Sequence, residues 1–267
     1  MQVSGSRQLR DALPRLAVLT GIWAVLTGLL VAAGELIVRS AAITGFDHRV
    51  TRNLVTSRTA ALNTAMRIVT WLGSWVALAI VAGFVAFLVV RKRLPVLAAI
   101  VGLLAWAGEA LGVRIAKEVV TRDRPPRDIW VVNAHGWSFP SGHSAAACLA
   151  FTVFALCVVA ITPHRAVRTL AWLFAGLAIA TVAFSRVELG VHWTTDVIAG
   201  VTFVACWLTA IVITLGGRLR GGVTRSSKPI PPNSAQPEPT PAPPGATEPA
   251  RTPAPPPPGR TRPPPRT

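Results

Sequence analysis

Long apolar runs recur along most of this sequence, and each is close to the length that an α-helix needs to cross a lipid bilayer. A crossing helix takes about 20 mainly apolar residues. Five or six segments qualify, and six is the preferred count, namely residues 16–38, 71–90, 94–115, 144–161, 167–184 and 197–215. These runs lack the strict alternation of polar and apolar side chains that is typical of barrel strands. The sequence therefore predicts an all-α fold, a bundle of six transmembrane helices.

The composition supports a membrane protein. Hydrophobic residues make up 51% of the 267 residues and charged residues only 14%. The formal net charge of +16 would suggest a nucleic acid partner in a soluble protein, but the basic residues lie mostly between the apolar runs and near the C-terminus. We therefore expect contacts with the lipid bilayer and its anionic headgroups, and no nucleic acid partner. Nothing in the sequence indicates an oligomeric state.

Both ends of the chain differ from its apolar middle. Residues 1–15 are interpreted as a cytoplasmic N-terminus, and the apolar run that follows as a retained signal anchor, because it is longer than a signal-peptide core. The helical domain is expected over residues 16–220. Residues 221–267 are rich in Pro and Arg and cannot bury a core, so we expect a disordered tail without a catalytic role. A solvated basic tail and a ligand for a proline-recognising partner both stay open.

Basic loops predict the orientation. The loops around residues 91–93, 164–168 and 218–220 are basic and alternate with the other set of loops. Cytoplasmic loops of membrane proteins carry an excess of Lys and Arg, so we expect these loops and both termini in the cytoplasm. The rule is not clean here, because the loop between the first two runs carries four arginines between residues 49 and 67.

A basic block follows the third apolar run. Lys117 and Arg124 are seven positions apart, about two helical turns, so they share a face if the helix continues until Pro125 stops it. Both could then contact one oxyanion, because Lys and Arg donate hydrogen bonds that match phosphate oxygens. The alternative is that the block, including Arg114 and Arg122, only extends its side chains to the membrane interface.

A second block, Pro140-Ser141-Gly142-His143, precedes the fourth apolar run. Ser141 is expected at the N-cap of a helix, with Gly142 beside it, which leaves backbone amides free to hold an anion near the helix dipole. His143 then falls in the first turn. The alternative is a simple helix start with His143 as an interfacial side chain.

The third block surrounds the loop between the last two runs. Ser185 and Arg186 end one run, and His192 and Asp196 begin the next, four positions apart, where they would stack on one helical face. The carboxylate can bind one imidazole N–H and leave the other nitrogen as a nucleophile. All three blocks follow odd-numbered runs, so they are predicted at one membrane face, the extracytoplasmic one. Three cations, two histidines and a carboxylate together indicate a phosphate pocket.

In this order and at these spacings, the three blocks resemble the signature of the phosphatidic acid phosphatase type 2 superfamily, which also includes vanadium haloperoxidases and bacterial acid phosphatases. The resemblance covers roughly residues 60–215. It implies an integral membrane phosphatase of the cell membrane that works through a phosphohistidine, without a metal or other cofactor. By this resemblance His192 is the nucleophile, Asp196 orients it and His143 protonates the leaving oxygen. The predicted phosphate ligands are Lys117, Arg124, Ser141, Gly142 and Arg186.

The substrate and the reaction stay open at this point. A site at a membrane face favours a lipid phosphate monoester or a polyprenyl diphosphate, and phosphatidic acid and phosphatidylglycerol phosphate fit equally well. One alternative is a lipid phosphotransferase, in which an alcohol replaces water at the phosphohistidine. Another is a lipid-phosphate binder or transporter without activity. The histidine pair argues against this last alternative, because binding alone needs only cations.

Overall fold

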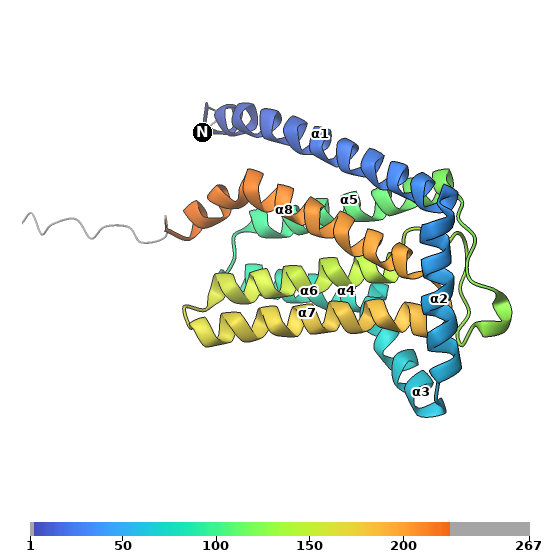
Figure 1. Ribbon diagram of the computed structural model, residues 1–267. Helices are drawn as coiled ribbons and strands as arrows, with labels where there is room; N and C mark the ends of the chain where they lie inside the picture. The colour runs from blue at the N-terminus through green and yellow to red at the C-terminus, as the bar shows by residue number, and fades with distance from the viewer. Residues whose placement is uncertain (1–2, 225–267) are drawn as a thin grey trace, which may run out of the picture. The chain divides into compact units, whose positions relative to one another are not determined.

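Helices make up all regular structure in the part of the chain that a computed structural model describes, residues 3–224 (Figure 1). The order of elements is α1 (Val3–Arg39), α2 (Ala41–Ser57), α3 (Ala60–Val69), η1 (Thr70–Gly73), α4 (Trp75–Val90), α5 (Val96–Val120), η2 (Arg127–Ile129), α6 (Gly142–Ile161), α7 (Arg165–Glu188) and α8 (Thr194–Thr224). The predicted tail, residues 221–267, lies outside the described residues except for the end of α8.

Five helices are long and apolar enough to cross a membrane, namely α1, α5, α6, α7 and α8. A sixth crossing is counted if α3 with η1 and α4, which are bent by 45° relative to each other, form one broken span. The prediction of a membrane-spanning helical bundle is thus confirmed, and the protein is an integral membrane protein.

The second apolar run was predicted as a helix from residue 71, but α4 begins only at Trp75. Ser74 caps it, since its hydroxyl accepts from the backbone N of Val76 at 3.2 Å.

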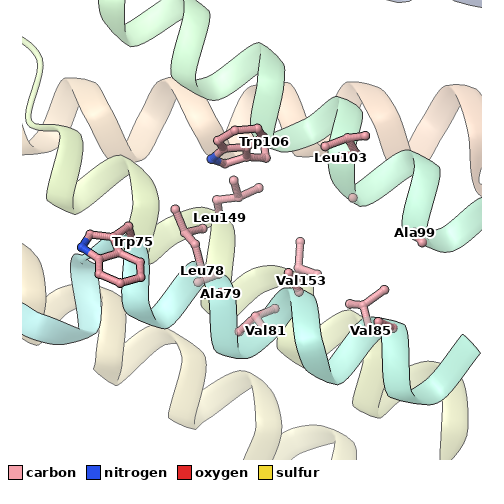
Figure 2. A pocket seen from close by; sticks show the side chains of 14 residues that line it. Trp75, Leu78, Ala79, Val81, Val85, Ala99, Leu103, Trp106, Leu149 and Val153 are labelled. Carbon is pink, nitrogen blue, oxygen red and sulfur yellow. The ribbon is translucent and has the colours of Figure 1, made fainter.

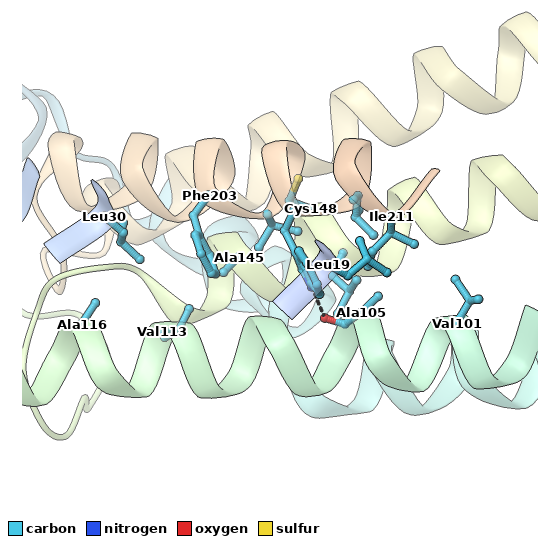
Figure 3. Close-up of a cluster of buried hydrophobic side chains, with 14 of the residues drawn as sticks. Leu19, Leu30, Val101, Ala105, Val113, Ala116, Ala145, Cys148, Phe203 and Ile211 are labelled. Carbon is cyan, nitrogen blue, oxygen red and sulfur yellow. Dashed lines mark hydrogen bonds between the residues drawn. The ribbon is translucent and has the colours of Figure 1, made fainter. Parts of the chain in front are cut away.

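The helix α6 lies inside the bundle and contacts α4, α5, α7 and α8 (Figure 1). Its buried face is rich in alanine, namely Ala145, Ala146, Ala147, Ala150 and Ala155. Such small residues allow helices to approach closely. The van der Waals packing at close approach favours the association of helices inside a membrane. The helix α1 packs against α5 and α8, and Figure 3 shows Leu19 and Leu30 of α1 gathered with Val113 of α5 and Phe203 of α8.

The segment between the first two apolar runs is helical, where the sequence predicted only a basic loop. Ser40 caps α2 by accepting from the backbone N of Ile43 at 3.4 Å, and Thr59 caps α3 by accepting from that of Leu62 at 3.1 Å. The helix α2 contacts α7 and α8 and crosses their ends (Figure 1). It thereby carries the buried Asp47 to the place where α8 begins.

Candidate active site

The three sequence blocks meet at one end of the bundle, the end beside α2 in Figure 1. The segment after α5 contacts the segment before α8, because Nη1 of Arg124 lies 3.0 Å from Nε2 of His192. The loop before α6 joins them, because the hydroxyl of Ser138 donates to Oδ2 of Asp196 at 2.5 Å. The blocks are therefore in direct contact, as their predicted shared membrane face requires.

His192 is buried in the turn before α8, and its contacts define which nitrogen carries the proton. A guanidinium only donates hydrogen bonds, so the contact from Arg124 makes Nε2 an acceptor and places the proton of the neutral ring on Nδ1. Nδ1 lies 3.4 Å from Oγ of Ser138 and 3.5 Å from Oδ2 of Asp196. Burial lowers the pKa of His192 to about 3; Asp196 opposes this shift, and the charges of Arg124 and Arg186 add to it. At neutral pH the ring is therefore uncharged.

Asp196 lies buried in the first turn of α8 and has closer partners than His192. Its Oδ2 accepts from the backbone N of Trp193 at 2.9 Å, and its Oδ1 accepts from Nη1 of Arg122 at 2.6 Å. The predicted stacking of His192 and Asp196 on one helical face is wrong, because α8 begins only at Thr194. The two side chains approach each other through the turn that precedes the helix, and Asp196 closes this turn as an N-terminal cap.

Arg122 and Asp47 belong to the same network, although the sequence singled out neither as a site residue. Besides Asp196, Arg122 donates to Oδ2 of Asp47 at 2.7 Å and to the hydroxyl of Thr195 at 2.8 Å. Asp47 also accepts from the backbone N of Thr195 at 3.0 Å and from its hydroxyl at 2.6 Å. One buried cation therefore joins a carboxylate of α2 to a carboxylate of α8. The only sequence signal was the position of Arg122 inside the basic block.

Lys117 and Arg124 do not share a helical face, so that prediction is wrong. The helix α5 ends at Val120, and Thr121 has a left-handed φ of 47° that turns the chain away. Lys117 donates to the carbonyl oxygen of Trp137 at 2.6 Å. Arg124 donates to carbonyl oxygens of residues 135–137 and 191 at 2.6–3.2 Å. Both cations thus border one loop, and a bound phosphate would replace some of these carbonyl contacts.

Arg186 reaches the site from the last turn of α7 and is only 4% exposed. Its Nη1 donates to the hydroxyl of Thr70 at 2.6 Å. Its Nε is buried and has no acceptor among the described residues. Buried donors are normally paired, so this N–H is available for an anion.

The helix α6 begins at Gly142, with His143 half-buried in its first turn as predicted. Ser141 occupies the N-cap position, but its hydroxyl accepts from that of Ser144 at 3.0 Å and caps no amide. Its own backbone N donates to the carbonyl oxygen of Asp196 at 3.0 Å. Within the described residues, no hydrogen bond from the amides of Gly142 and His143 is found. Free amides at a helix N-terminus attract an anion.

The arrangement places a neutral imidazole, a second histidine and several fixed cations at one end of the bundle, together with the unpartnered Nε of Arg186. Such a set can bind a phosphoryl group, attack it and stabilise the charge that spreads over its oxygens. Among residues 3–224, no group of three or more His, Cys, Asp or Glu side chains is placed to hold a metal ion.

Residues 94–220 match the model of the PAP2 superfamily. Over 99 residues the chain is 35% identical to phosphatidylglycerophosphatase B of Bacillus subtilis (strain 168), an alignment that takes in 37% of this chain and 48% of that protein. The chain thus matches about half the length of this relative. A crystal structure of a transmembrane PAP2-type phosphatidylglycerolphosphate phosphatase from Bacillus subtilis is similar in fold, with a TM-score of 0.61, 23% identity and coverage of 77% of this chain and 98% of that one.

Proposed function

Because residues 94–220 match the model of the PAP2 superfamily, we propose that the chain is a membrane phosphatase of this superfamily that hydrolyses a lipid phosphate monoester or a polyprenyl diphosphate through a phosphohistidine intermediate. The hydrogen-bond geometry around His192 is the observation that carries the proposal. Its Nε2 lone pair points to Arg124, where a phosphate would bind, while Nδ1–H faces Asp196. A nucleophile needs this arrangement, with the proton on one nitrogen and the lone pair on the other, and a phosphate that draws Arg124 to its own oxygens would free Nε2 for attack.

The reaction has two steps. Nε2 of His192 attacks phosphorus, the bond to the leaving oxygen breaks, and His143, which acts in its protonated imidazolium form, gives that oxygen a proton and becomes neutral. The ring of His192 now carries a positive charge, which Asp196 stabilises through Nδ1. Water then attacks phosphorus, the bond between Nε2 and phosphorus breaks, the neutral His143 takes up the proton of the water, and inorganic phosphate leaves. Lys117, Arg124 and Arg186 neutralise the phosphoryl oxygens throughout.

In the proposed reaction, side-chain cations hold the phosphate, and we propose that no metal ion is needed. Hard divalent cations bind through clusters of carboxylate and carbonyl oxygens. Asp196 and Asp47 are instead occupied by Arg122. We expect full activity in the presence of EDTA, and an activity that EDTA abolishes and Mg²⁺ restores would contradict the proposal.

The membrane position favours a lipid whose phosphate lies at the surface. The site lies at the ends of α5, α6, α7 and α8, where a headgroup can enter while the chains stay in the bilayer. The name of the Bacillus relative makes phosphatidylglycerol phosphate the first substrate to test. The site is proposed to face the extracytoplasmic side of the cell membrane, because the basic loops at residues 91–93 and 162–168 lie at the other ends of these helices.

The proposal is tested by incubating the purified protein in detergent with a panel of lipid phosphates and measuring inorganic phosphate. We expect release by the wild type, none by His192→Ala, and unchanged release by His164→Ala, whose side chain is exposed on the loop between α6 and α7. Release that persists in His192→Ala would contradict the phosphohistidine. A product in which an added alcohol carries the phosphate would instead indicate the phosphotransferase.

A further inference from the structure

Four arginines lie between residues 49 and 67, and one of them is largely buried. Arg49, Arg52 and Arg67 are exposed, whereas the side chain of Arg58 is only 10% exposed. Arg58 occupies the corner between α2 and α3, at the end of the bundle where the candidate site lies (Figure 1). A buried guanidinium requires partners, because it has lost its hydration.

Arg58 joins three segments of the chain. From the α2–α3 corner, its Nη1 donates to the carbonyl oxygen of Ile129, the last residue of η2, at 2.7 Å. Its Nε lies 3.9 Å from Oε1 of Glu188, the last residue of α7, whose side chain is only 1% exposed. This distance is longer than a hydrogen bond, so the pair is held by the attraction between opposite charges, which is stronger in a buried place than in water.

The two charges depend on each other. Among the described residues, neither side chain has a second ion pair, and neither carboxylate oxygen of Glu188 accepts a hydrogen bond. In the same part of the chain, Nε and Nη2 of Arg58 are buried without an acceptor. Removing one member of a buried pair leaves the other charge uncompensated, which costs far more than losing a pair at the surface. Arg58 is therefore the counter-charge that allows a carboxylate to be buried at the end of α7.

The two segments that Arg58 contacts also contact each other directly. The backbone N of Val131 donates to the carbonyl oxygen of Leu189 at 3.0 Å. Val131 follows Ile129 by two residues and Leu189 follows Glu188 by one, so Arg58 binds next to both ends of this hydrogen bond. The guanidinium therefore fixes how residues 129–131 lie against residues 188–192, which we call the histidine turn.

Gly190 shows how closely Arg58 fits against the histidine turn. Its φ of 72° lies in the left-handed region that favours glycine. A Cβ added there would lie 3.0 Å from Nη2 of Arg58 and 2.5 Å from the carbonyl oxygen of Ile129. The turn ends at His192, whose backbone N donates to the carbonyl oxygen of Arg186 at 3.2 Å. Arg58 thus packs against the turn that carries the proposed nucleophile.

Apolar packing covers these polar contacts but does not replace them. Met66 of α3 is buried with Leu189 and Val191, and Trp130 packs against this cluster. Hydrophobic contacts are not directional, whereas a hydrogen bond restricts the positions of particular atoms. We therefore expect α3 to keep the histidine turn covered, and Arg58 to fix where the turn lies.

We propose that Arg58 and Glu188 are positioning residues, whose ion pair holds the histidine turn so that Nε2 of His192 is in line for attack on phosphorus. This inference rests on the proposed function. Neither side chain touches the substrate in this proposal, so the pair acts on the chemical step and not on substrate binding. A displacement of about 1 Å at a reacting group is enough to lower a rate by about a hundredfold.

Arg58→Met tests the proposal, because methionine is also long and unbranched but has neither the charge nor the donors. With phosphatidylglycerol phosphate in detergent, we expect kcat to fall about tenfold to a hundredfold and KM to stay within about twofold of the wild type. Arg58→Lys keeps the charge and should keep more of kcat than Arg58→Met. The control Arg52→Met, at an exposed position of α2, should match the wild type. A raised KM with unchanged kcat, or a loss in Arg58→Lys as large as in Arg58→Met, would overturn the proposal.

A double variant, Arg58→Met with Glu188→Gln, tests whether the two side chains act as one unit. If they do, its kcat should be no lower than that of the weaker single variant, whereas independent effects multiply and would overturn the pair. Removing both charges destabilises a protein less than removing one. The double variant therefore serves even where thermal unfolding shows that a single variant does not fold, and a wild-type kcat in the double variant would contradict the positioning role.

Amide hydrogen exchange separates this proposal from the proposed function, because it needs no activity. In Arg58→Met the amides of residues 129–131 and 188–192 should exchange about tenfold faster or more, while those of residues 200–210 in α8 stay unchanged. Faster exchange supports the positioning role even if the wild type releases no phosphate, in which case only the proposed function fails. If the wild type is active and Arg58→Met changes neither this exchange nor kcat, the positioning role is overturned and the proposed function stands.

Discussion

At the scale of single residues, the position of Asp196 depends on partners other than the histidine it faces. Arg122 and Ser138 donate to its two oxygens at 2.6 and 2.5 Å, while Nδ1 of His192 lies 3.5 Å away. Hydrogen bonds to charged groups are among the stronger ones in proteins. Arg122 and Ser138 therefore hold the carboxylate in place, and the carboxylate in turn orients the imidazole.

We predict that Asp47→Asn lowers kcat by about tenfold to a hundredfold, because Arg122 loses its second anion and a small displacement of Asp196 misaligns His192. KM for a lipid phosphate should change little, since Asp47 is not among the phosphate ligands. Asp128→Asn, at an exposed position, serves as the matched control. A raised KM with unchanged kcat, or an equal loss in Asp128→Asn, would show that Asp47 does not position the nucleophile.

A second prediction concerns the two histidines. His192→Ala should abolish phosphoenzyme formation with every substrate, because no nucleophile remains. His143→Ala removes only the proton for the leaving group, so an aryl phosphate, whose leaving group needs little protonation, should keep more activity than a lipid alkyl phosphate. The ratio of the two rates, together with trapping of the phosphoenzyme, is the measurement. Equal loss with both substrates in His143→Ala would contradict its role as the acid.

The lowered pKa of His192 predicts a pH dependence of stability. Between about pH 3 and the ordinary value of 6.5, the unfolded chain binds a proton at His192 and the folded protein does not. Acid therefore favours the unfolded state, and the free energy of unfolding should fall as the pH falls through this window. His192→Gln should show a weaker dependence in thermal unfolding in detergent, and the exposed control His164→Gln should follow the wild type. Identical slopes in all three proteins would mean that His192 is not buried in its neutral form.

At the scale of elements, η1 contacts the start of α6 so closely at Gly73 that no side chain fits there. A Cβ at Gly73 would lie 2.6 Å from Cγ1 of Val182 and 2.7 Å from the carbonyl oxygen of His143. Gly200 of α8 is similarly close to the carbonyl oxygen of Ser141, at 2.7 Å. Two glycines thus allow η1 and α8 to approach the start of α6, where His143 of the candidate site is placed.

We expect Gly73→Ala to destabilise the protein by about 1–3 kcal/mol, the usual cost of overpacking, and to reduce activity because His143 must shift. Gly83→Ala is the control, since an added Cβ there meets no atom within 4 Å and alanine favours a helix. Thermal unfolding and phosphate release in the same detergent measure both effects. A Gly73→Ala protein as stable and active as Gly83→Ala would disprove the tight contact.

At the scale of the described bundle, the phosphate site and the basic connecting loops lie at opposite ends of the helices. The site is formed where α5 and α7 end and where α6 and α8 begin, whereas residues 91–95 and 162–164 connect the other ends. The basic residues of those loops favour the cytoplasm. A substrate phosphate is therefore expected to be cleaved on the outer side.

The topology can be measured with single cysteines in a variant that lacks the native ones. Ser57, Asp128 and Asn133 are exposed near the site, so cysteines there should react with a membrane-impermeant maleimide on intact cells. Cysteines at Lys92 and His164 should react only after the membrane is permeabilised. Residues 189–191 are buried and unsuitable for this purpose. Labelling of Asp128→Cys and Lys92→Cys from the same side would contradict the proposed orientation.

The sequence by itself determined the class of fold and predicted the main groups of the candidate site. Long apolar runs require helices in a bilayer, because no other backbone arrangement of such runs satisfies its own hydrogen bonds there. The blocks that contain Lys117, His143 and His192 stand at the ends of those runs, so their shared location followed from counting the crossings. Local spacing was less reliable, because it assumed that α5 extends past Val120 and that α8 begins before Thr194.

Only the tertiary structure decided which polar residues face inward. Arg114 and Arg122 belong to one basic block, yet Arg114 is exposed and Arg122 is buried. The difference comes from Asp47, a carboxylate 75 positions away that α2 carries to the same place. An apolar groove lined by α4, α5 and α6 (Figure 2) likewise depends on small residues of three helices that are separate in sequence. A buried charge and an open space both depend on neighbours that are distant along the chain, so local patterns do not contain them.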